Sequence, residues 1–329
     1  MNASLPLSAD ALRLDPAAET ERITNRIREM VFHQLKRKGA VVAVSGGIDS
    51  SVVAFLCARA LGHDRVLALF LPEDESSPES LRLGGMAARA LDIPSKVENI
   101  GPVLQAARCY ERRDDAVRLV VPEYGPGYKC KIVLPSATDA DRYAIFSVVV
   151  QAPDGATKKV RLNAAAYLGI VAATNFKQRT RKMIEYHYAD LLQYAVAGTP
   201  NRLEHDLGFF VKNGDGAADF KPIAHLYKSQ VFQLAAYLGV PDEIRRQPPT
   251  TDTYSLPQSQ EEFYFMAPLE TVDLCLYAMD HGIPAAGLAP AVGMDQQQVE
   301  RLYGFIEGKR KMAAYLHSAA LSVEPVERG

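Results

Sequence analysis

A serine- and glycine-rich heptad at residues 45–51, SGGIDSS, contains residue types that can bind a phosphate group. Glycines let the backbone approach an anion closely, and the first N–H groups of a following helix would point towards that anion. The hydroxyl groups of Ser45, Ser50 and Ser51 can donate further hydrogen bonds. The Asp49 carboxylate could hold Mg²⁺ against the phosphates. The heptad therefore predicts a phosphate-binding loop.

The residues on either side of the heptad favour a turn between a strand and a helix. Residues 41–44 form an apolar run typical of a buried parallel strand, and residues 52–56 continue as an apolar helix. The loop lacks the G-x-x-x-x-G-K-[ST] pattern of a Walker P-loop. An ordinary turn with serine caps is the alternative that the residue types leave open. The heptad resembles the PP-loop of the N-type ATP pyrophosphatases, which implies cleavage of ATP between its α and β phosphates.

Strands and helices alternate after this loop. Residues 65–71 predict a second buried strand, residues 95–100 predict a third short strand, and residues 80–91 predict the helix between them. This alternation is typical of an open parallel sheet, which binds its ligand beyond the carboxyl ends of the strands. We therefore expect an α/β fold, a Rossmann-like open parallel sheet with helices on both faces. The resemblance to the PP-loop enzymes implies the adenine nucleotide alpha hydrolase-like form of that fold.

The middle of the chain has a different pattern. Residues 106–121 predict a charged helix, whereas residues 129–134, 142–151 and 157–162 predict strands, the last two joined by a turn at 152–156. This stretch is expected to be a β-rich insertion. Its boundaries divide the chain into three predicted parts: 1–108, an N-terminal arm, a helix and the first half of the nucleotide domain; 109–162, the insertion; and 163–329, the second half with the C-terminal helices.

From residue 175 onward the chain is expected to return to the nucleotide domain, with the next strand beginning within 193–197. Residues 163–173 are small and apolar, and their pattern does not decide between a helix and a strand. Residues 209–218 and 247–260 are rich in glycine, proline and polar side chains, so we expect loops that cover the site. Amphipathic patterns predict the other helices at 19–38, 179–195, 227–238, 268–281 and 293–315.

Composition limits the class of protein. The chain has 329 residues, 48% of them hydrophobic, and a formal net charge of −2, so a sizeable core is expected and a broad nucleic-acid-binding face is not. The four cysteines are far apart and show no metal-binding spacing, which predicts reduced, buried thiols in a cytoplasmic protein. No segment has the pattern of a signal peptide or a membrane span.

Several blocks in the second half resemble the NAD synthetases, the enzymes that amidate nicotinic acid adenine dinucleotide (deamido-NAD) with ammonia and ATP. They are residues 198–204 (GTPNRLE), 208–219 (GFFVKNGDGAAD) and 226–231 (LYKSQV). Residues 175–181 (NFKQRTR) and 247–250 (QPPT) resemble further blocks of that family, and 269–277 its helix near the end. The blocks occur in the family's order across nearly the whole chain.

The resemblance implies roles for residues of this sequence. It implies that the PP-loop residues Ser45, Gly46, Gly47, Ser50 and Ser51 bind pyrophosphate, that Asp49 and Glu204 ligate Mg²⁺, and that Arg179, Thr199, Lys228 and Thr250 contact ATP. It implies that Lys212, Asp215 and Asp219 bind deamido-NAD, with Asp215 at the ammonia end. The catalytic residues implied are Asp49, Thr199, Asp215 and Lys228.

Residue types alone allow simpler interpretations. Glu204 could be the exposed start of a helix, and Lys228 could lie on the solvated face of an amphipathic helix. Asp215 and Asp219 could stabilise turns, because aspartate hydrogen-bonds nearby backbone groups. These interpretations stay open at this stage.

Three departures from the family pattern stand out. Pro200 occupies the position where the family usually has aspartate, residues 308–310 (GKR) are what remains of an H-K-R string, and Lys182 resembles an extra residue. The expected function is amidation of deamido-NAD through an acyl-adenylate. The alternatives are a related PP-loop ligase for another carboxylic acid and an inactive nucleotide-binding sensor. The family implies a homodimer that uses free ammonia, or ammonia from a separate glutamine amidase.

Overall fold

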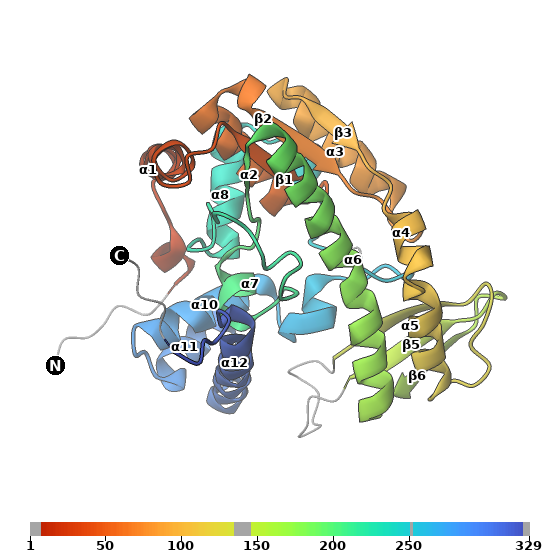
Figure 1. Cartoon of the computed structure of the whole chain (residues 1–329). Helices are drawn as coiled ribbons and strands as arrows, with labels where there is room; N and C mark the ends of the chain where they lie inside the picture. Colours follow the sequence, from red (N-terminus) through yellow and green to blue (C-terminus); the bar gives the residue numbers. More distant parts are fainter. Residues whose placement is uncertain (1–7, 135–145, 251–252, 325–329) are drawn as a thin grey trace.

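A four-stranded parallel sheet forms the centre of the computed structural model, which describes residues 8–134, 146–250 and 253–324 (Figure 1). The strand order is β3-β2-β1-β7. The strands are β1 (Ala40–Ala43), β2 (Val66–Phe70), β3 (Ser95–Val97) and β7 (Ala195–Val196). The predicted α/β fold with an open parallel sheet is confirmed. The third strand is shorter than expected, because it ends at Val97.

Helices cover both faces of this sheet, as expected. Side chains alternate along β1, so Val42 packs in one apolar cluster and Val41 in another. On the first face lie α1 (Pro16–Arg28), α2 (Ile48–Leu61), α3 (Pro78–Leu91) and α8 (Lys228–Leu238). On the second face lie α4 (Gly101–Ala106), α5 (Cys109–Arg118) and α6 (Ala164–Leu192).

The helix predicted at 19–38 starts earlier and ends differently. Asp15 caps its N-terminus by accepting from the N–H groups of Ala17 and Ala18, and Pro16 occupies the first turn. The helix then widens into a π-helical turn, η2 (Glu29–Gln34). This turn precedes β1, whose carboxyl end carries the serine- and glycine-rich loop.

The insertion contains a separate antiparallel sheet of three strands, β4 (Lys129–Val133), β5 (Ser147–Gln151) and β6 (Thr157–Arg161). The predicted turn at 152–156 is confirmed, since the Ala152 N–H donates to the Ala156 oxygen at 2.8 Å. The strand expected to begin at 142 starts at Ser147, and residues 142–145 lie outside the described residues. The division of the chain at 109 and 162 stays a prediction.

Two helix predictions in this region need correction. The helix expected at 106–121 is shorter: α5 spans Cys109–Arg118, and Arg108, which has a left-handed conformation with φ of 55°, separates it from α4, which ends at Ala106. Conversely, residues 163–173 and the helix expected at 179–195 form one continuous helix of 29 residues, α6. Asn163 caps its start, and it runs through Lys182 without interruption.

The C-terminal helices form a further layer beside the sheet (Figure 1). They pack around their own apolar cluster, to which the first turn of the chain contributes Leu12. The helices of this layer are α7 (Arg202–Leu207), α10 (Leu269–Asp280), α11 (Ala285–Val292) and α12 (Gln296–His317), with the π-helical turn η4 (Glu261–Phe265); the short α9 (Asp242–Arg245) follows α8.

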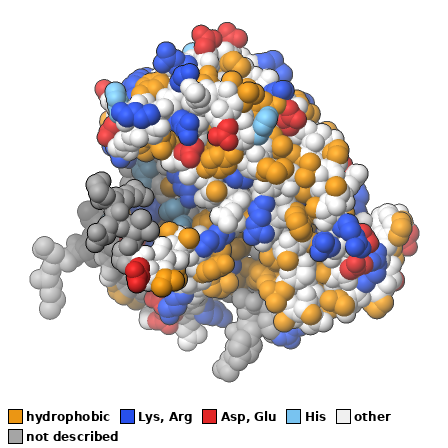
Figure 2. All heavy atoms as spheres, viewed as in Figure 1, with side chains coloured by type: hydrophobic (Ala, Val, Ile, Leu, Met, Phe, Trp, Pro, Cys, Tyr) orange, Lys and Arg blue, Asp and Glu red, His pale blue; other side chains and the backbone are white. Residues whose placement is uncertain are grey.

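Surface and cysteine features agree with the composition. Charges of both signs are dispersed over the face in Figure 2, with hydrophobic side chains between them. Cys57, Cys109, Cys130 and Cys275 are buried and unpaired, as expected. None of the described helices combines the length and apolarity that a membrane crossing requires. The cytoplasmic location stays a prediction.

Candidate active site

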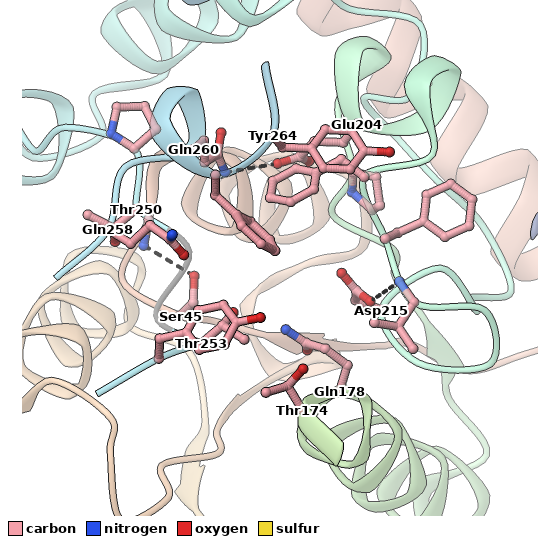
Figure 3. A pocket seen from close by; sticks show the side chains of 18 of the residues that line it. Ser45, Thr174, Gln178, Glu204, Asp215, Thr250, Thr253, Gln258, Gln260 and Tyr264 are labelled. Atoms are coloured by element: carbon pink, nitrogen blue, oxygen red, sulfur yellow. Dashed lines mark hydrogen bonds between the residues drawn. The ribbon is translucent and has the colours of Figure 1, made fainter. Parts of the chain in front are cut away.

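A cavity of about 1320 Å³ lies at the carboxyl ends of the parallel strands. The loops that follow β1, β2 and β7 line it, together with α12 and residues of the segment 247–264 (Figure 3). β1 lies between β2 and β7, so the loops after β1 and β7 diverge at this point of the sheet. Open α/β sheets bind ligands at such a switch point.

The loop after β1 has the shape of an anion cradle. Gly46 has φ of 84°, and a Cβ atom there would lie 2.5 Å from the Ser80 carbonyl oxygen, so only glycine fits. The Gly47 N–H donates to the Ser45 hydroxyl at 3.3 Å. Gly47 is also the N-cap of α2, whose first N–H groups face the cavity end of the loop.

Serine hydroxyls hold this loop in shape. Ser50 and Ser51 both donate to the Gly47 carbonyl oxygen, at 3.1 and 2.9 Å. Ser45 and Ser50 line the cavity, whereas Ser51 is fully buried behind the loop and does not. The structure therefore gives Ser51 a role in shaping the loop.

Asp49 and Lys228 form an ion pair at the floor of the cavity. The Asn201 side-chain amide donates to the other Asp49 oxygen at 3.0 Å. Lys228 is only 2% exposed, so the solvated-face interpretation of this lysine is wrong. Asp273, from α10, accepts from the N–H groups of Lys228 and Ser229 and thereby caps α8. Burial raises the pKa of Asp273 to about 6.

Glu204 provides a second carboxylate beside Asp49. It belongs to a capping box with Asn201 at the start of α7, and it accepts from the Gln260 amide at 3.1 Å (Figure 3). Burial, and next the charge of Asp49, raise the pKa of Glu204 to about 8. Two carboxylates next to a phosphate cradle are the hard oxygen donors that Mg²⁺ prefers, so the residues present fit this ion.

Two of the residues expected to bind the dinucleotide, Asp215 and Lys212, line the cavity. Asp215 lines the cavity and accepts from the Val211 N–H at 2.8 Å, and burial raises its pKa. Lys212 also lines the cavity, and its ammonium donates to the carbonyl oxygens of Tyr315 and Ser318 at the end of α12. Arg179 is exposed beside it and donates to the Lys212 carbonyl oxygen at 3.3 Å.

The cavity does not bring all predicted residues together. Thr199 and Thr250 line it. Thr250 belongs to the described part of the segment 247–264, which is called the covering loop below. Asp219 does not line it, because its carboxylate accepts from the Val196 N–H at 2.7 Å and from the Tyr186 hydroxyl at 3.3 Å. This aspartate fastens the loop to β7.

Lys309 lines the cavity although sequence reasoning gave it no role. Its ammonium lies 3.3 Å from the centre of the Tyr264 ring, and burial lowers its pKa to about 7. The neighbouring Arg310 turns away and binds Asp206 at 2.9 Å and Asp280 at 2.8 Å. In residues 308–310, Lys309 therefore lines the cavity, and Arg310 joins α12 to α7 and α10 through Asp206 and Asp280.

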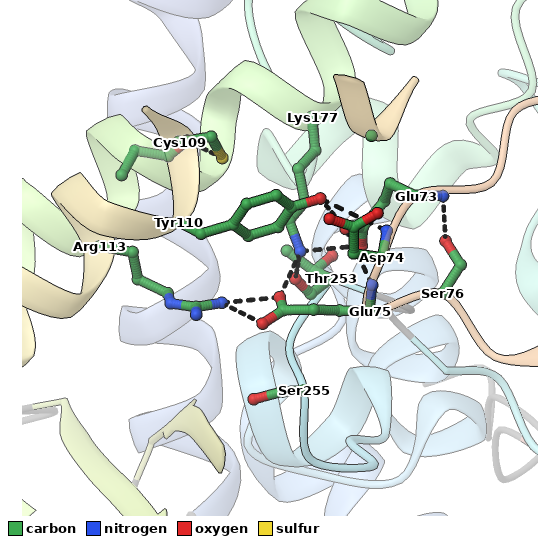
Figure 4. A network of polar contacts seen from close by, with 12 residues as sticks. Glu73, Asp74, Glu75, Ser76, Cys109, Tyr110, Arg113, Lys177, Thr253 and Ser255 are labelled. Atoms are coloured by element: carbon green, nitrogen blue, oxygen red, sulfur yellow. Dashed lines mark hydrogen bonds and ion pairs between the residues drawn. The ribbon is translucent and has the colours of Figure 1, made fainter. Parts of the chain in front are cut away.

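A buried ionic network joins the loop after β2 to the covering loop (Figure 4). The Lys177 ammonium, 1% exposed, binds Glu73 at 2.9 Å, Glu75 at 2.7 Å and the Thr253 carbonyl oxygen at 2.8 Å. Arg113 binds Glu75 at 2.6 Å. Sequence reasoning missed this network, because its members are scattered along the chain.

The insertion sheet also contacts the covering loop. The Cys130 N–H donates to the Ser255 hydroxyl at 2.9 Å, and the Leu256 N–H donates to the Cys130 carbonyl oxygen at 3.2 Å. The Leu134 N–H donates to the Glu262 carbonyl oxygen at 3.1 Å. The edge of the insertion sheet therefore supports the loop that carries Thr250 and Gln260.

Comparison with known proteins identifies one family. The sequence model of NAD synthase matches residues 19–120 and 149–313 and leaves 121–148, within the insertion, unmatched. A protein of Rhizobium rhizogenes is 56% identical over 97% of this chain and 96% of its own length. One of Rhizobium meliloti is 54% identical over 98% and 96%. Both relatives are named NH3-dependent NAD+ synthetase.

Solved structures share the fold at lower identity. NMN synthetase from Francisella tularensis gives a TM-score of 0.65 at 22% identity and covers 94% of this chain and 99% of its own. NH3-dependent NAD synthetase from Campylobacter jejuni gives 0.63 at 22% identity and covers 95% and 100%. At such identity these likenesses concern the fold alone.

Proposed function

This chain belongs to the NAD synthase family, and from that premise we propose that it amidates deamido-NAD with ammonia, using ATP and releasing AMP and pyrophosphate. The observation that supports this most strongly is the identity of 54–56% over nearly the full length to relatives named NH3-dependent NAD+ synthetase. A cavity with a phosphate cradle at its floor and cations at its far side suits two nucleotide ligands.

Pyrophosphate binds over the serine- and glycine-rich loop. The N–H groups at the start of α2 and the hydroxyls of Ser45 and Ser50 face the leaving phosphates, while Gly46 and Gly47 permit close approach. Lys228 and Thr250 supply a cation and a hydroxyl to the same phosphates. Ser51 acts indirectly by holding the Gly47 carbonyl.

Asp49 and Glu204 would hold Mg²⁺, which supplies neutralisation of phosphate charge when it is bound. The positive charge of Mg²⁺ would stabilise the ionised form of Glu204, which burial beside Asp49 otherwise disfavours. The remaining contacts of both acids, Asn201 and Gln260, keep the two carboxylates oriented towards the cavity.

The reaction has two steps. The nicotinate carboxylate of deamido-NAD attacks the α-phosphorus of ATP, the bond from that phosphorus to pyrophosphate breaks, and an acyl-adenylate forms. Lys228 and the N–H groups of α2 stabilise the charge that moves onto pyrophosphate. Ammonia then attacks the acyl carbon, and AMP leaves with the electrons of the broken C–O bond.

Proton transfer accompanies the second step. Ammonium must lose one proton before it attacks, and the nitrogen loses a second proton after it has bonded to the acyl carbon. We assign this role to Asp215, whose burial raises its pKa and so makes the carboxylate a better proton acceptor. Thr199, at the carboxyl end of β7, donates to the adenylate or to the oxyanion.

The dinucleotide occupies the side of the cavity near α12 and α6. Lys212 binds the dinucleotide there, and the neighbouring Arg179 contacts ATP, since a guanidinium can bind phosphate at two points. Asp219 acts on this side by fastening the loop to β7. We also propose a homodimer, because the exposed face of α6 carries large apolar side chains at Leu168 and Met183.

Incubation of the purified protein with ATP, Mg²⁺, deamido-NAD and ammonium tests the proposal. NAD, AMP and pyrophosphate are expected in equal amounts, and ADP formation would contradict the mechanism. Glutamine in place of ammonium should give no product without a separate amidase. Replacing deamido-NAD with nicotinic acid mononucleotide tests the alternative of a related ligase. Amidation of the mononucleotide in preference to deamido-NAD would favour that alternative.

A further inference from the structure

Two aromatic rings from different elements stack on each other at the wall of the cavity that faces the insertion. They belong to Phe146, which directly precedes β5, and Tyr167, in the first turn of α6. Their centroids are 4.6 Å apart and their planes meet at 22°. Both residues line the cavity. This aromatic pair is therefore part of the ligand space.

The backbone holds both rings in place. The Leu162 N–H donates to the Phe146 carbonyl oxygen at 3.0 Å, which fixes the start of β5 against the end of β6. The Tyr167 N–H donates to the oxygen of Asn163, the residue that caps α6. The pair needs little ordering when a ligand arrives, so a contact with it would lose little entropy.

One face of α6 continues the wall towards the phosphate cradle. Tyr167, Val171, Thr174 and Gln178 are spaced by three or four residues, lie on the same helix face and line the cavity. In Figure 3 the Gln178 side chain points into the cavity. The wall thus offers an aromatic surface with an amide at its polar end, where a heterocyclic base could be both stacked and hydrogen-bonded.

The covering loop forms an apolar boundary beside this wall. Tyr254 and Phe263 line the cavity and contact each other edge to face, with centroids 5.6 Å apart. Both pack in the same cluster as Phe146 and Tyr167. The four aromatic side chains give this part of the cavity an apolar lining, which suits an aromatic ring better than a phosphate or a sugar.

We propose that Phe146 and Tyr167 form a stacking site for the heteroaromatic ring of a nucleotide substrate, supplied in part by the insertion. Phe146 belongs to residues 121–148, which the family model does not match, whereas Tyr167 lies in the matched part, so the insertion adds one of the two rings. The proposal rests on the proposed function only in naming the two candidate sources of the ring, ATP and deamido-NAD.

Substitution of Phe146 tests the stacking site. Phe146→Ala should raise the Kd of one nucleotide about tenfold, in the range that loss of base stacking produces, and leave the other within twofold. Calorimetric titration of ATP alone and of deamido-NAD alone identifies which nucleotide supplies the ring. Phe146→Tyr should bind both nucleotides like the wild type. Phe146→Leu should raise the Kd nearly as much as Phe146→Ala, because leucine keeps an apolar core residue but removes the aromatic ring.

Tyr128→Ala is the matched control. Tyr128 belongs to the same insertion, contacts the Tyr124 ring in a tilted arrangement with centroids 5.5 Å apart, and does not line the cavity. Unchanged Kd values in Phe146→Ala, or equal weakening of both nucleotides in Phe146→Ala and Tyr128→Ala, would overturn the proposal. Binding is measured without turnover, so failure to make NAD would refute the proposed function and leave this test intact.

Discussion

Lys228 places its ammonium group against the Asp49 carboxylate across 179 positions of sequence. Lys228 starts α8 and Asp49 lies in the first turn of α2, so the pair fastens the two helices at the carboxyl end of the sheet. Glu204 adds a second acid to this place. The Lys228 ammonium therefore pairs with Asp49 and also acts on Glu204, because its charge opposes the rise of the Glu204 pKa.

Lys228→Met should abolish activity and destabilise the fold. Removing one partner of a buried ion pair leaves an uncompensated charge, which typically lowers the free energy of unfolding by about 3–5 kcal/mol. Urea unfolding and AMP formation measure the two effects. The double variant with Asp49→Asn should regain most of the lost stability and none of the activity. A double variant no more stable than the single one would contradict the pairing.

Glu204→Gln should separate metal binding from helix capping. Glutamine also serves at the third position of a capping box, so the free energy of unfolding should change by less than about 1 kcal/mol. The Mg²⁺ concentration for half-maximal activity should rise at least about tenfold, because a neutral amide replaces a charged ligand. Asn201→Ala is the complementary control, since it removes the cap and should lower stability by about 1 kcal/mol.

Equal Mg²⁺ dependence in Glu204→Gln and the wild type would remove Glu204 from the proposed metal site. Asp49→Asn provides the second measurement. This change keeps the side-chain size, and it should abolish pyrophosphate release with any acyl acceptor. Retained turnover would assign Asp49 to the ion pair with Lys228 alone.

Local signals allowed the sequence to predict the cradle. The strand that precedes the heptad, the turn, the helix cap and the carboxylate all lie within residues 40–51, so the structure of the cradle follows from short-range chemistry. The capping box of Asn201 and Glu204 is also local, but its position beside Asp49 depends on β7 pairing with β1. Without the family resemblance, that pairing could not be predicted from spacing.

Long-range packing decides what the local patterns left open. Lys228 is on an amphipathic helix and was compatible with a solvated face, yet Asp49 and Asp273 surround its first turn. Residues 163–173 pack in the apolar cluster of the insertion, whereas the later turns of α6 pack against the main sheet. The break between α4 and α5 occurs at Arg108, which is neither glycine nor proline and gives no sequence signal.

Ser255→Ala should loosen the covering loop without altering the chemistry. The Ser255 hydroxyl accepts from the Cys130 N–H of the insertion sheet, and its loss should cost about 1 kcal/mol of local stability. Amide hydrogen exchange in 253–264 should accelerate several-fold, and the KM for ATP should rise while kcat stays within twofold. Lys158→Met, which removes an exposed pair with Glu123 in the same sheet, should change neither.

Unchanged exchange rates in Ser255→Ala would show that the remaining contacts, which include the Leu256–Cys130 hydrogen bond and the Lys177 network, suffice to hold this loop. That network joins the Thr253 carbonyl to Glu73 and Glu75 (Figure 4). The two tethers act on neighbouring residues of the loop, so a combined variant should exchange faster than either single variant.

Lys309→Met should stabilise the protein at low pH and weaken nucleotide binding. Burial lowers the folded-state pKa of Lys309 to about 7 from an ordinary value of 10.5. Between these values the unfolded chain binds more protons, so wild-type stability gains from this group as pH rises from about 7 to 10. Below pH 7 the full cost of burying the charge remains. The stability advantage of Lys309→Met should therefore be largest at pH 6 and shrink towards pH 10.

Thermal unfolding of both proteins at pH 6 and pH 9.5 checks this prediction, with Lys311→Met as the control on the exposed face of α12. Lys311→Met should show no such pH-dependent difference. Because the Lys309 ammonium lines the cavity, its loss should also raise the KM of at least one anionic nucleotide at pH 7. A variant that is less stable than the wild type at pH 6 would mean that the contact with the Tyr264 ring outweighs the cost of burial.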